Sequence, residues 1–171
     1  KANERSDLPN FYLNLLSYKK ALQANNTPFT PAINLYFALE AALEMMGTEG
    51  LESIVNRHNR HRKAIQEGMK AIGLPLFAKE GFGSPSITAV APNNLDAEAI
   101  RKYVKANFDI LLAGGQDHLK GKVFRIGHLG FVNDRDILTV VAAIEASLKN
   151  LGAINGEIGN GIAASAKALS E

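Results

Sequence analysis

The sequence contains no cysteine among its 171 residues. This absence excludes a disulfide framework, thiolate metal sites and a cysteine nucleophile within the chain, and it is compatible with a reducing cytosol. The sequence also has no run of about 18 apolar residues and no basic leader followed by an apolar stretch. We therefore expect no membrane span and no signal peptide, and we expect a cytoplasmic protein.

An excess of one charge is missing as well. The chain has 19 Lys and Arg against 17 Asp and Glu, a formal net charge of +2. Such a balance gives no strong attraction to nucleic acid or to an anionic membrane. The one basic run, residues 57–62, has no interleaved aromatic residues, so nucleic-acid binding is not expected. His58 and His61 in this run are spaced to hold a metal on a helix, but no third ligand is apparent, and we expect a solvated helix flank there.

Apolar residues, in contrast, are plentiful. They make up 46% of the chain, enough for a real core, and the length suits one medium domain or a domain plus an extension. The first residues, Lys1 to Asp7, include no starting methionine and read like the middle of a longer polypeptide. We therefore expect the chain to be a part of a larger protein.

The pattern of apolar and turn residues predicts helices first and then the order β-β-α-β-β-α. Because strands and helices do not alternate strictly, an α+β fold is expected, with helices covering a largely antiparallel four-stranded sheet. A long helix beginning at Pro31 and capped by Thr30 is apolar nearly all round, which predicts burial between other elements. Asn133 with Asp136 predicts the start of the last helix of the sheet domain. The four expected strands are residues 74–78, 86–91, 108–113 and 123–128.

Arg125 is the candidate functional residue that stands out most. It lies inside the otherwise apolar run Val123 to Gly127, and an ionised side chain is costly to desolvate without a partner. A guanidinium is suited to gripping a carboxylate through two parallel hydrogen bonds. From the residues alone, three readings stay open: an edge strand with its arginine in water, an ion pair with an internal Asp or Glu, and a site for an external acid.

Two further segments could bind an anion. Asn26, Thr27 and Thr30 precede the long apolar helix, where backbone N–H groups and hydroxyls form a natural anion site. From the residues alone, ordinary helix capping is the favoured explanation. Gly114, Gly115 and Gly121 lie in the loop before Arg125 and could cradle a phosphate. They match neither a P-loop nor a dinucleotide fingerprint, and the loop could equally be a flexible hairpin.

Three motifs in order resemble those of class V aminotransferases, in the alanine/serine–glyoxylate branch. They are Thr-Pro-Phe-Thr-Pro-Ala-Ile-Asn-Leu-Tyr at 27–36, Gly-Leu-Glu at 50–52, and Gly-Gly at 114–115 running to Lys-Gly-Lys-Val-Phe-Arg-Ile-Gly-His-Leu-Gly at 120–130. The resemblance covers roughly residues 8 to 150. Some cyanobacterial members of this branch carry the label soluble hydrogenase small (tritium-exchange) subunit.

The resemblance implies a fold type I enzyme that uses pyridoxal 5′-phosphate (PLP) and works as a homodimer with sites at the subunit interface. It implies that Arg125 binds the α-carboxylate of an amino-acid or keto-acid substrate. It also implies that Asn26, Thr27 or Thr30 contacts the cofactor phosphate, typically of the neighbouring subunit. Glyoxylate enzymes often carry Tyr and His just before this threonine, whereas this chain has Asn25 and Asn26, so the contacting side chain stays open.

The family's Schiff-base lysine lies upstream of the segment that corresponds to Lys1, so no catalytic residue is expected within this chain. Accordingly we expect residues 1–30 to be a helix and turn leading from a large domain, residues 31–151 to be the small C-terminal domain, and residues 152–171 to be a low-complexity tail, loosely held, with a short helix possible over 163–169.

The expected function is amino-group transfer between a small amino acid and a keto acid such as glyoxylate or pyruvate, with the chain alone inactive. The alternative is a non-catalytic interaction or assembly subunit, and the lack of cysteine disfavours hydrogenase chemistry in this chain.

Overall fold

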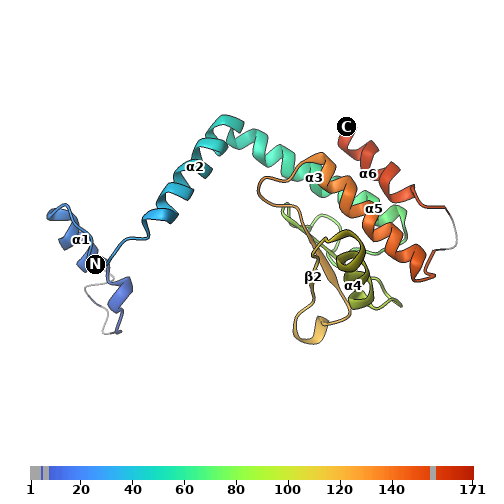
Figure 1. Ribbon diagram of the computed structural model, residues 1–171, viewed down its shortest axis with the longest axis horizontal. Helices are drawn as coiled ribbons and strands as arrows, with labels where there is room; N and C mark the ends of the chain where they lie inside the picture. The colour runs from blue at the N-terminus through green and yellow to red at the C-terminus, as the bar shows by residue number, and fades with distance from the viewer. Residues whose placement is uncertain (1–4, 6–7, 155–156) are drawn as a thin grey trace. The chain divides into compact units, whose positions relative to one another are not determined.

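The computed structural model describes residue 5 and residues 8–154 and 157–171. The chain divides into two compact units, Lys1–Glu49 and Gly50–Glu171 (Figure 1). Each unit is described by itself below.

The first unit contains a short 3-10 helix, η1 (Phe11–Leu13), followed by α1 (Leu15–Gln23) and α2 (Ile33–Glu49). Asn14 caps α1, because its side-chain oxygen accepts hydrogen bonds from the backbone N–H groups of the first helical turn. The turn between α1 and α2 is held by Phe29, whose ring stacks on Tyr12 with centroids 4.9 Å apart and lies 5.2 Å from the ring of Phe11. Aromatic packing therefore fixes the turn that contains the threonines.

Helix α2 differs from its sequence-based expectation in two ways. It begins at Ile33 and not at Pro31, and Ala32 rather than Thr30 precedes its first residue. It also has no buried residue, so the expected long buried helix is wrong for this chain as described. The apolar residues are present all round, but within the described residues no other element covers them. A helix with this composition needs partner surfaces on more than one side.

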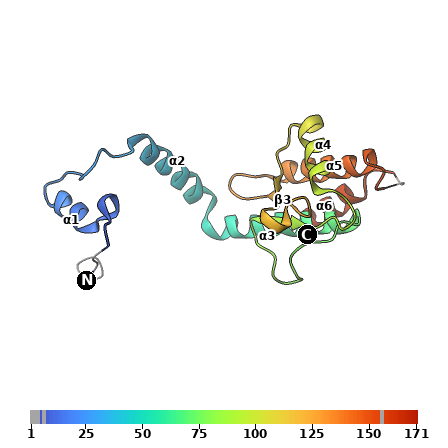
Figure 2. The same cartoon turned by 90° about the horizontal axis from the view of Figure 1, so that it is seen from below.

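The second unit is a three-stranded antiparallel sheet with helices packed against it (Figures 1 and 2). The strand order is β1-β3-β2, so β3 is central and pairs with both neighbours. This confirms the α+β class and the antiparallel sheet, with three strands where four were expected. The elements are α3 (Leu51–Ala71), β1 (Ile87–Val90), α4 (Ala97–Phe108), β2 (Ala113–Gly114), η2 (Asp117–Leu119), β3 (Phe124–Gly127), α5 (Asp134–Asn150) and α6 (Asn160–Ser170).

The missing fourth strand has a local cause. The segment expected as the first strand, 74–78, forms only an isolated bridge between Leu76 and Val90. Pro75 contributes a carbonyl, which accepts from the N–H of Ala91, but it has no N–H to extend the ladder. The segment expected as the third strand, 108–113, is also shortened, because Asp109 ends α4 in the left-handed conformation at φ 54°. Only Ala113 and Gly114 then pair with β3.

The core lies between the sheet and helices α3, α4 and α5. Phe124 and Ile126 of the central strand point into it from one face of the sheet. Since alternate residues of a strand point to opposite faces, the intervening residue of β3 must point away from this core. The core side chains are Ala64, Ile65, Met69, Ile72, Leu74, Val90, Ala97, Ile100, Val104, Leu112, Phe124, Ile126, Ile137, Val140, Val141, Ala143, Ile144, Leu148 and Ala168.

The last helix, α6, lies along α3 and α5 (Figure 1). Gly68 of α3 allows this close approach, because a Cβ there would lie 2.2 Å from Ser165 Oγ. Ser165 donates a 2.9 Å hydrogen bond to the carbonyl of Ala64, and the buried carboxylate of Glu145 accepts from the N–H groups of Gly159 and Gly161 at the start of α6. The expectation of a loosely held tail is therefore wrong for 160–170, where small residues allow tight packing.

None of the helices in the described part of the chain is both long enough and apolar enough to cross a membrane.

Candidate functional site

Arg125 lies in the middle of the central strand and points away from the core. Its neighbours Phe124 and Ile126 are buried on the helix side, whereas Arg125 is only partly buried on the opposite face. Because β3 has a partner strand on each side, the reading of Arg125 as an edge-strand residue is wrong.

The residues beside Arg125 on this face are small. In the sheet register Ala89 of β1 lies opposite Arg125 on one side, and Ala113 of β2 lies opposite it on the other. Cross-strand partners share a face, and an alanine fills little of the space that a long side chain would take. Gly127, two residues further along β3, adds no side chain at all. The guanidinium therefore has only two alanines directly opposite it on the neighbouring strands.

The hydrogen bonds of Arg125 leave its outer edge open. Its Nε–H donates to the backbone carbonyl of Gly114 at 3.2 Å. Within residues 5, 8–154 and 157–171, no Asp or Glu forms an ion pair with Arg125, and its two terminal nitrogens have no hydrogen-bond partner. The reading of Arg125 as one half of an internal ion pair is thus not supported. What remains is a fixed guanidinium whose two outer N–H groups can take a planar acid group.

The carbonyl of Gly114 is the feature that the sequence analysis missed. The Gly-Gly pair was considered as a phosphate cradle or a hairpin, but the structure uses Gly114 in the two-residue strand β2 and as the acceptor for Arg125. The signal that could have found it is the glycine itself, because a glycine in a strand often marks a close approach of another group.

The turn before α2 holds the other three candidate residues. The N–H of Thr27 donates to Asn26 Oδ1 at 2.8 Å, and the Thr27 hydroxyl donates to the carbonyl of Phe29 at 2.8 Å. The side-chain groups that remain as donors are the amide of Asn26 and the hydroxyl of Thr30, and both residues are exposed. Asn26, Thr27 and Thr30 lie in the first unit and Arg125 in the second, so the structure describes them as two separate sets.

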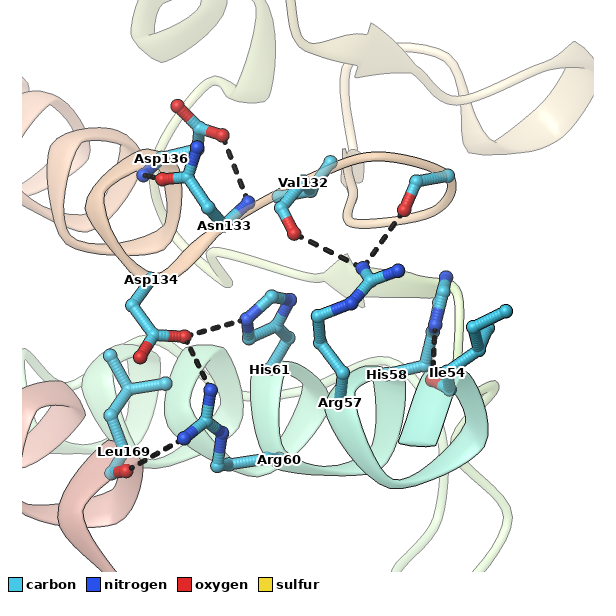
Figure 3. A network of polar contacts seen from close by, with 11 residues as sticks. Ile54, Arg57, His58, Arg60, His61, Val132, Asn133, Asp134, Asp136 and Leu169 are labelled. Carbon is cyan, nitrogen blue, oxygen red and sulfur yellow. Dashed lines mark hydrogen bonds and ion pairs between the residues drawn. The ribbon is translucent and has the colours of Figure 1, made fainter. Parts of the chain in front are cut away.

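A polar network links α3 to the segment that follows β3 (Figure 3). Arg57 donates to the carbonyls of Gly130 and Val132 at 2.9 and 3.1 Å. One turn later, His61 Nε2 donates to Asp134 Oδ1 at 2.9 Å, next to the start of α5. His61 is fully buried, so the expected solvated flank is wrong for this residue. These contacts fasten the chain just beyond the strand that carries Arg125.

The histidines of this region make hydrogen bonds within the second unit. Among the residues that the structure describes, no group of three or more His, Asp or Glu side chains is arranged to hold a metal ion. His58 instead donates from Nδ1 to the carbonyl of Ile54 within α3.

His128 is buried on the core side of the sheet. Its Nε2 lies 3.0 Å from Thr88 Oγ1 in a hydrogen bond, and its Nδ1 has no partner within the described part of the chain. Burial lowers the pKa of His128 to about 4, and the nearby His61 and His58 act in the same direction. Burial also lowers the pKa of His61, against the opposing effect of Asp134.

The buried His128 predicts a stability loss in mild acid. Between the usual histidine pKa of 6.5 and the folded-state value of about 4, the unfolded chain binds a proton that the folded chain does not. Stability then falls as the pH falls through this window, by up to about 1.4 kcal/mol per pH unit. Urea unfolding at several pH values checks this: the stability of wild type relative to His128→Gln should be constant above pH about 6.5 and should decline below it. A pH-independent difference would contradict the prediction.

Comparison with known proteins assigns the chain to a family, although no family model matches it. The chain is 56% identical over 169 residues to the "Soluble hydrogenase, small subunit" of Synechococcus sp. (strain PCC 6716), covering 99% of this chain and 44% of that protein. It is 39% identical over 144 residues to serine–glyoxylate aminotransferase of Arabidopsis thaliana, covering 83% of this chain and 36% of that protein. It thus spans less than half the length of these relatives.

A solved structure with a similar fold belongs to the same group of enzymes as these sequence relatives. The crystal structure of ureidoglycine–glyoxylate aminotransferase from Bacillus subtilis superposes with a TM-score of 0.89 at 28% identity, over 99% of this chain and 44% of that one. Similarity in sequence and in fold thus points to the same group of proteins. The chain belongs to the class V aminotransferases, of the alanine/serine–glyoxylate group, and corresponds to their C-terminal part.

Proposed function

We propose that the chain is the substrate-binding C-terminal part of a cytoplasmic aminotransferase that transfers an amino group between a small amino acid and a keto acid such as glyoxylate or pyruvate. The proposal rests on the hydrogen bonding of Arg125. Its Nε–H is bonded to the carbonyl of Gly114, and its two terminal nitrogens have no partner among the described residues, on a face where Ala89 and Ala113 lie opposite it. In this proposal Arg125 binds the α-carboxylate, which both kinds of substrate possess.

Class V aminotransferases depend on PLP. The turn 25–30 fits the cofactor phosphate as a set of neutral donors, because the amide of Asn26 and the hydroxyl of Thr30 can donate to phosphate oxygens. The hydroxyl of Thr27 could join them only by leaving the carbonyl of Phe29. We propose Asn26, Thr27 and Thr30 as the phosphate contacts of this chain. Asn26 and Thr30 can donate without breaking a hydrogen bond, whereas Thr27 must first release the carbonyl of Phe29.

When bound, PLP supplies the electron sink for amino-group transfer. This chain's own contribution is to bind and orient: Arg125 holds the carboxylate end of the substrate, so the amino or keto group points in one direction. The chain contains no lysine that matches the family's Schiff-base position, so we propose that it is inactive by itself.

We also propose that the active protein is a homodimer in which the turn 25–30 of one subunit serves the site of the other. The exposed apolar residues of α2 support this assembly, because such a helix is stable in water only when other surfaces cover it. Leu35, Tyr36 and Phe37 are 71, 63 and 65% exposed within the described chain.

Absorbance spectroscopy with PLP tests the proposed function. The isolated 171-residue chain should gain no stable visible band of lysine-bound PLP, because its lysines do not match the Schiff-base position. The intact gene product that carries the chain should show such a band, and adding an amino acid should bleach it. An intact gene product without the band, under conditions where it is folded, would remove the basis of the proposal.

A second candidate function is a non-catalytic subunit that assembles with other proteins. The name of the Synechococcus relative favours it, since that protein is called a soluble hydrogenase small subunit. The same absorbance experiment separates the two functions, because an assembly subunit needs no PLP. Purification of the intact gene product under native conditions would add a second measure. A catalytic homodimer would contain one kind of chain, whereas a complex built by an assembly subunit would contain several kinds.

A further inference from the structure

The guanidinium of Arg125 is oriented by a single backbone atom. Its Nε–H donates to the carbonyl of Gly114, in the short edge strand β2. A guanidinium held at Nε presents its two outer nitrogens in one plane, which is the geometry for a bidentate carboxylate contact. The direction in which Arg125 points therefore depends on where the carbonyl of Gly114 lies.

A strand of two residues is weak by itself, and a second arginine supports it. Arg101 of α4 donates from Nε to the carbonyl of Leu112 at 2.8 Å. Its Nη1 also pairs with Glu98 Oε2 at 2.5 Å, one turn earlier on the same helix. Both side chains are partly buried, at 24 and 29% exposure, which reduces the competition of water for these bonds. Arg101 thus fixes the backbone two residues before the acceptor of Arg125.

The ends of the Arg101 and Glu98 side chains lie close to Gly114, so a side chain at 114 would push them away. A Cβ on Gly114 would lie 2.8 Å from Arg101 Nη1 and 3.0 Å from Glu98 Oε1. The pair therefore touches Gly114 on its Cα, whereas Arg125 takes its carbonyl. On the following residue, the N–H of Gly115 donates to the carbonyl of Val123 at 3.0 Å, which fastens the other end of the strand to β3.

We propose that Arg101, paired with Glu98 and packed on Gly114, is a positioning residue for the carboxylate-binding Arg125. This inference rests on the proposed function of Arg125 and extends it to α4 and β2. Arg101 does not touch the substrate; it holds the Leu112–Gly114 backbone, and Gly114 aims the guanidinium. Removing Arg101 leaves the charge of Arg125 in place but lets its direction vary, so the loss falls on binding of the acid group.

The experiment combines NMR on the 171-residue chain with kinetics on the intact gene product. In Arg101→Met, which retains most of the side-chain volume but no N–H, exchange of the Arg125 Nε–H with water should rise about tenfold. The KM for the amino-acid substrate should rise about tenfold, with kcat within about twofold. Gly114→Ala tests the same contact from the other side and should give the same pattern. Lys105→Met, on the exposed side of α4, is the matched control and should change neither measurement.

The outcomes separate the inference from the function on which it rests. If Arg125→Lys raises KM but Arg101→Met and Gly114→Ala change neither exchange nor KM, the positioning role is overturned and the proposed function stands. If the two variants speed exchange but Arg125→Lys leaves KM unchanged, the proposed function fails. If Arg101→Met does not fold, Gly114→Ala alone decides: faster exchange with raised KM supports positioning, and wild-type values of both overturn it.

Discussion

Arg125→Lys in the intact gene product is expected to lower kcat/KM for the amino-acid substrate about 30-fold, or by about 2 kcal/mol. A lysine keeps the positive charge but cannot donate to Gly114 and to both carboxylate oxygens at once. The orientation of the substrate is lost along with one of two charged hydrogen bonds. Steady-state kinetics with amino-acid and keto-acid substrates measures the change.

The control for this variant is Arg135→Lys, an exposed arginine on α5. It makes the same chemical change away from the proposed site and should leave kcat/KM unaltered. The sheet should stay folded in both variants, because Arg125 lies on the face away from the core. Unchanged turnover and unchanged KM in Arg125→Lys would mean that the guanidinium serves the fold and not the substrate.

Gly68→Ala is expected to destabilise the second unit by about 2 kcal/mol, although alanine is the better helix former. The new methyl would lie 2.2 Å from Ser165 Oγ and 3.2 Å from both the carbonyl oxygen of Gly161 and Val141 Cγ1. Ser165 cannot move away freely, because it is buried and bonded to the carbonyl of Ala64. Helix α6 would be displaced from α3, and urea unfolding followed by circular dichroism measures the loss.

Two further variants test the cause. Ser165→Ala removes the closest atom, so the double variant with Gly68→Ala should lose clearly less than the sum of the two single losses. Gly47→Ala, in α2, makes the same exchange where no atom lies within 4 Å of the new Cβ, and it should leave the second unit as stable as wild type. A Gly68→Ala protein as stable as wild type would mean that α6 is not held against α3.

Local signals in the sequence located several features correctly. The pattern at Asn133 and Asp136 predicts a helix start, and the structure has a complete capping box there. The apolar residues on either side of Arg125 predict a strand, and alternation then places the guanidinium on the face opposite Phe124 and Ile126. These predictions succeed because each depends on residues within a few positions of one another.

Features that depend on distant residues were not predicted. The bond from Arg125 to the carbonyl of Gly114 joins positions 11 residues apart through a strand only two residues long. The support from Arg101 comes from a different helix. The loss of the expected strand at 74–78 follows from its place at the edge of the sheet, where Pro75 interrupts the ladder. The spacing of residues along the chain does not predict such contacts between different helices and strands.

Composition gives wrong expectations at the two ends of the chain. The apolar sequence of α2 predicted burial, yet burial depends on a partner surface that the sequence of the helix does not supply. Glycine, alanine and serine after 152 suggested a loose segment, whereas the same small residues allow α6 to approach α3 at Gly68. Low side-chain volume is compatible with disorder and with tight helix contact, and only the facing surface decides between them.

Glu145 has a practical consequence for protein engineering. Trimming the 11-residue terminal helix α6 would take away the Gly161 N–H, one of the two donors to a carboxyl group that is 1% exposed. The carboxyl group would then face water in place of α6, and so would Ile72 and Val141, against which Gly161 of α6 lies. An affinity tag should therefore follow α6 and not replace it.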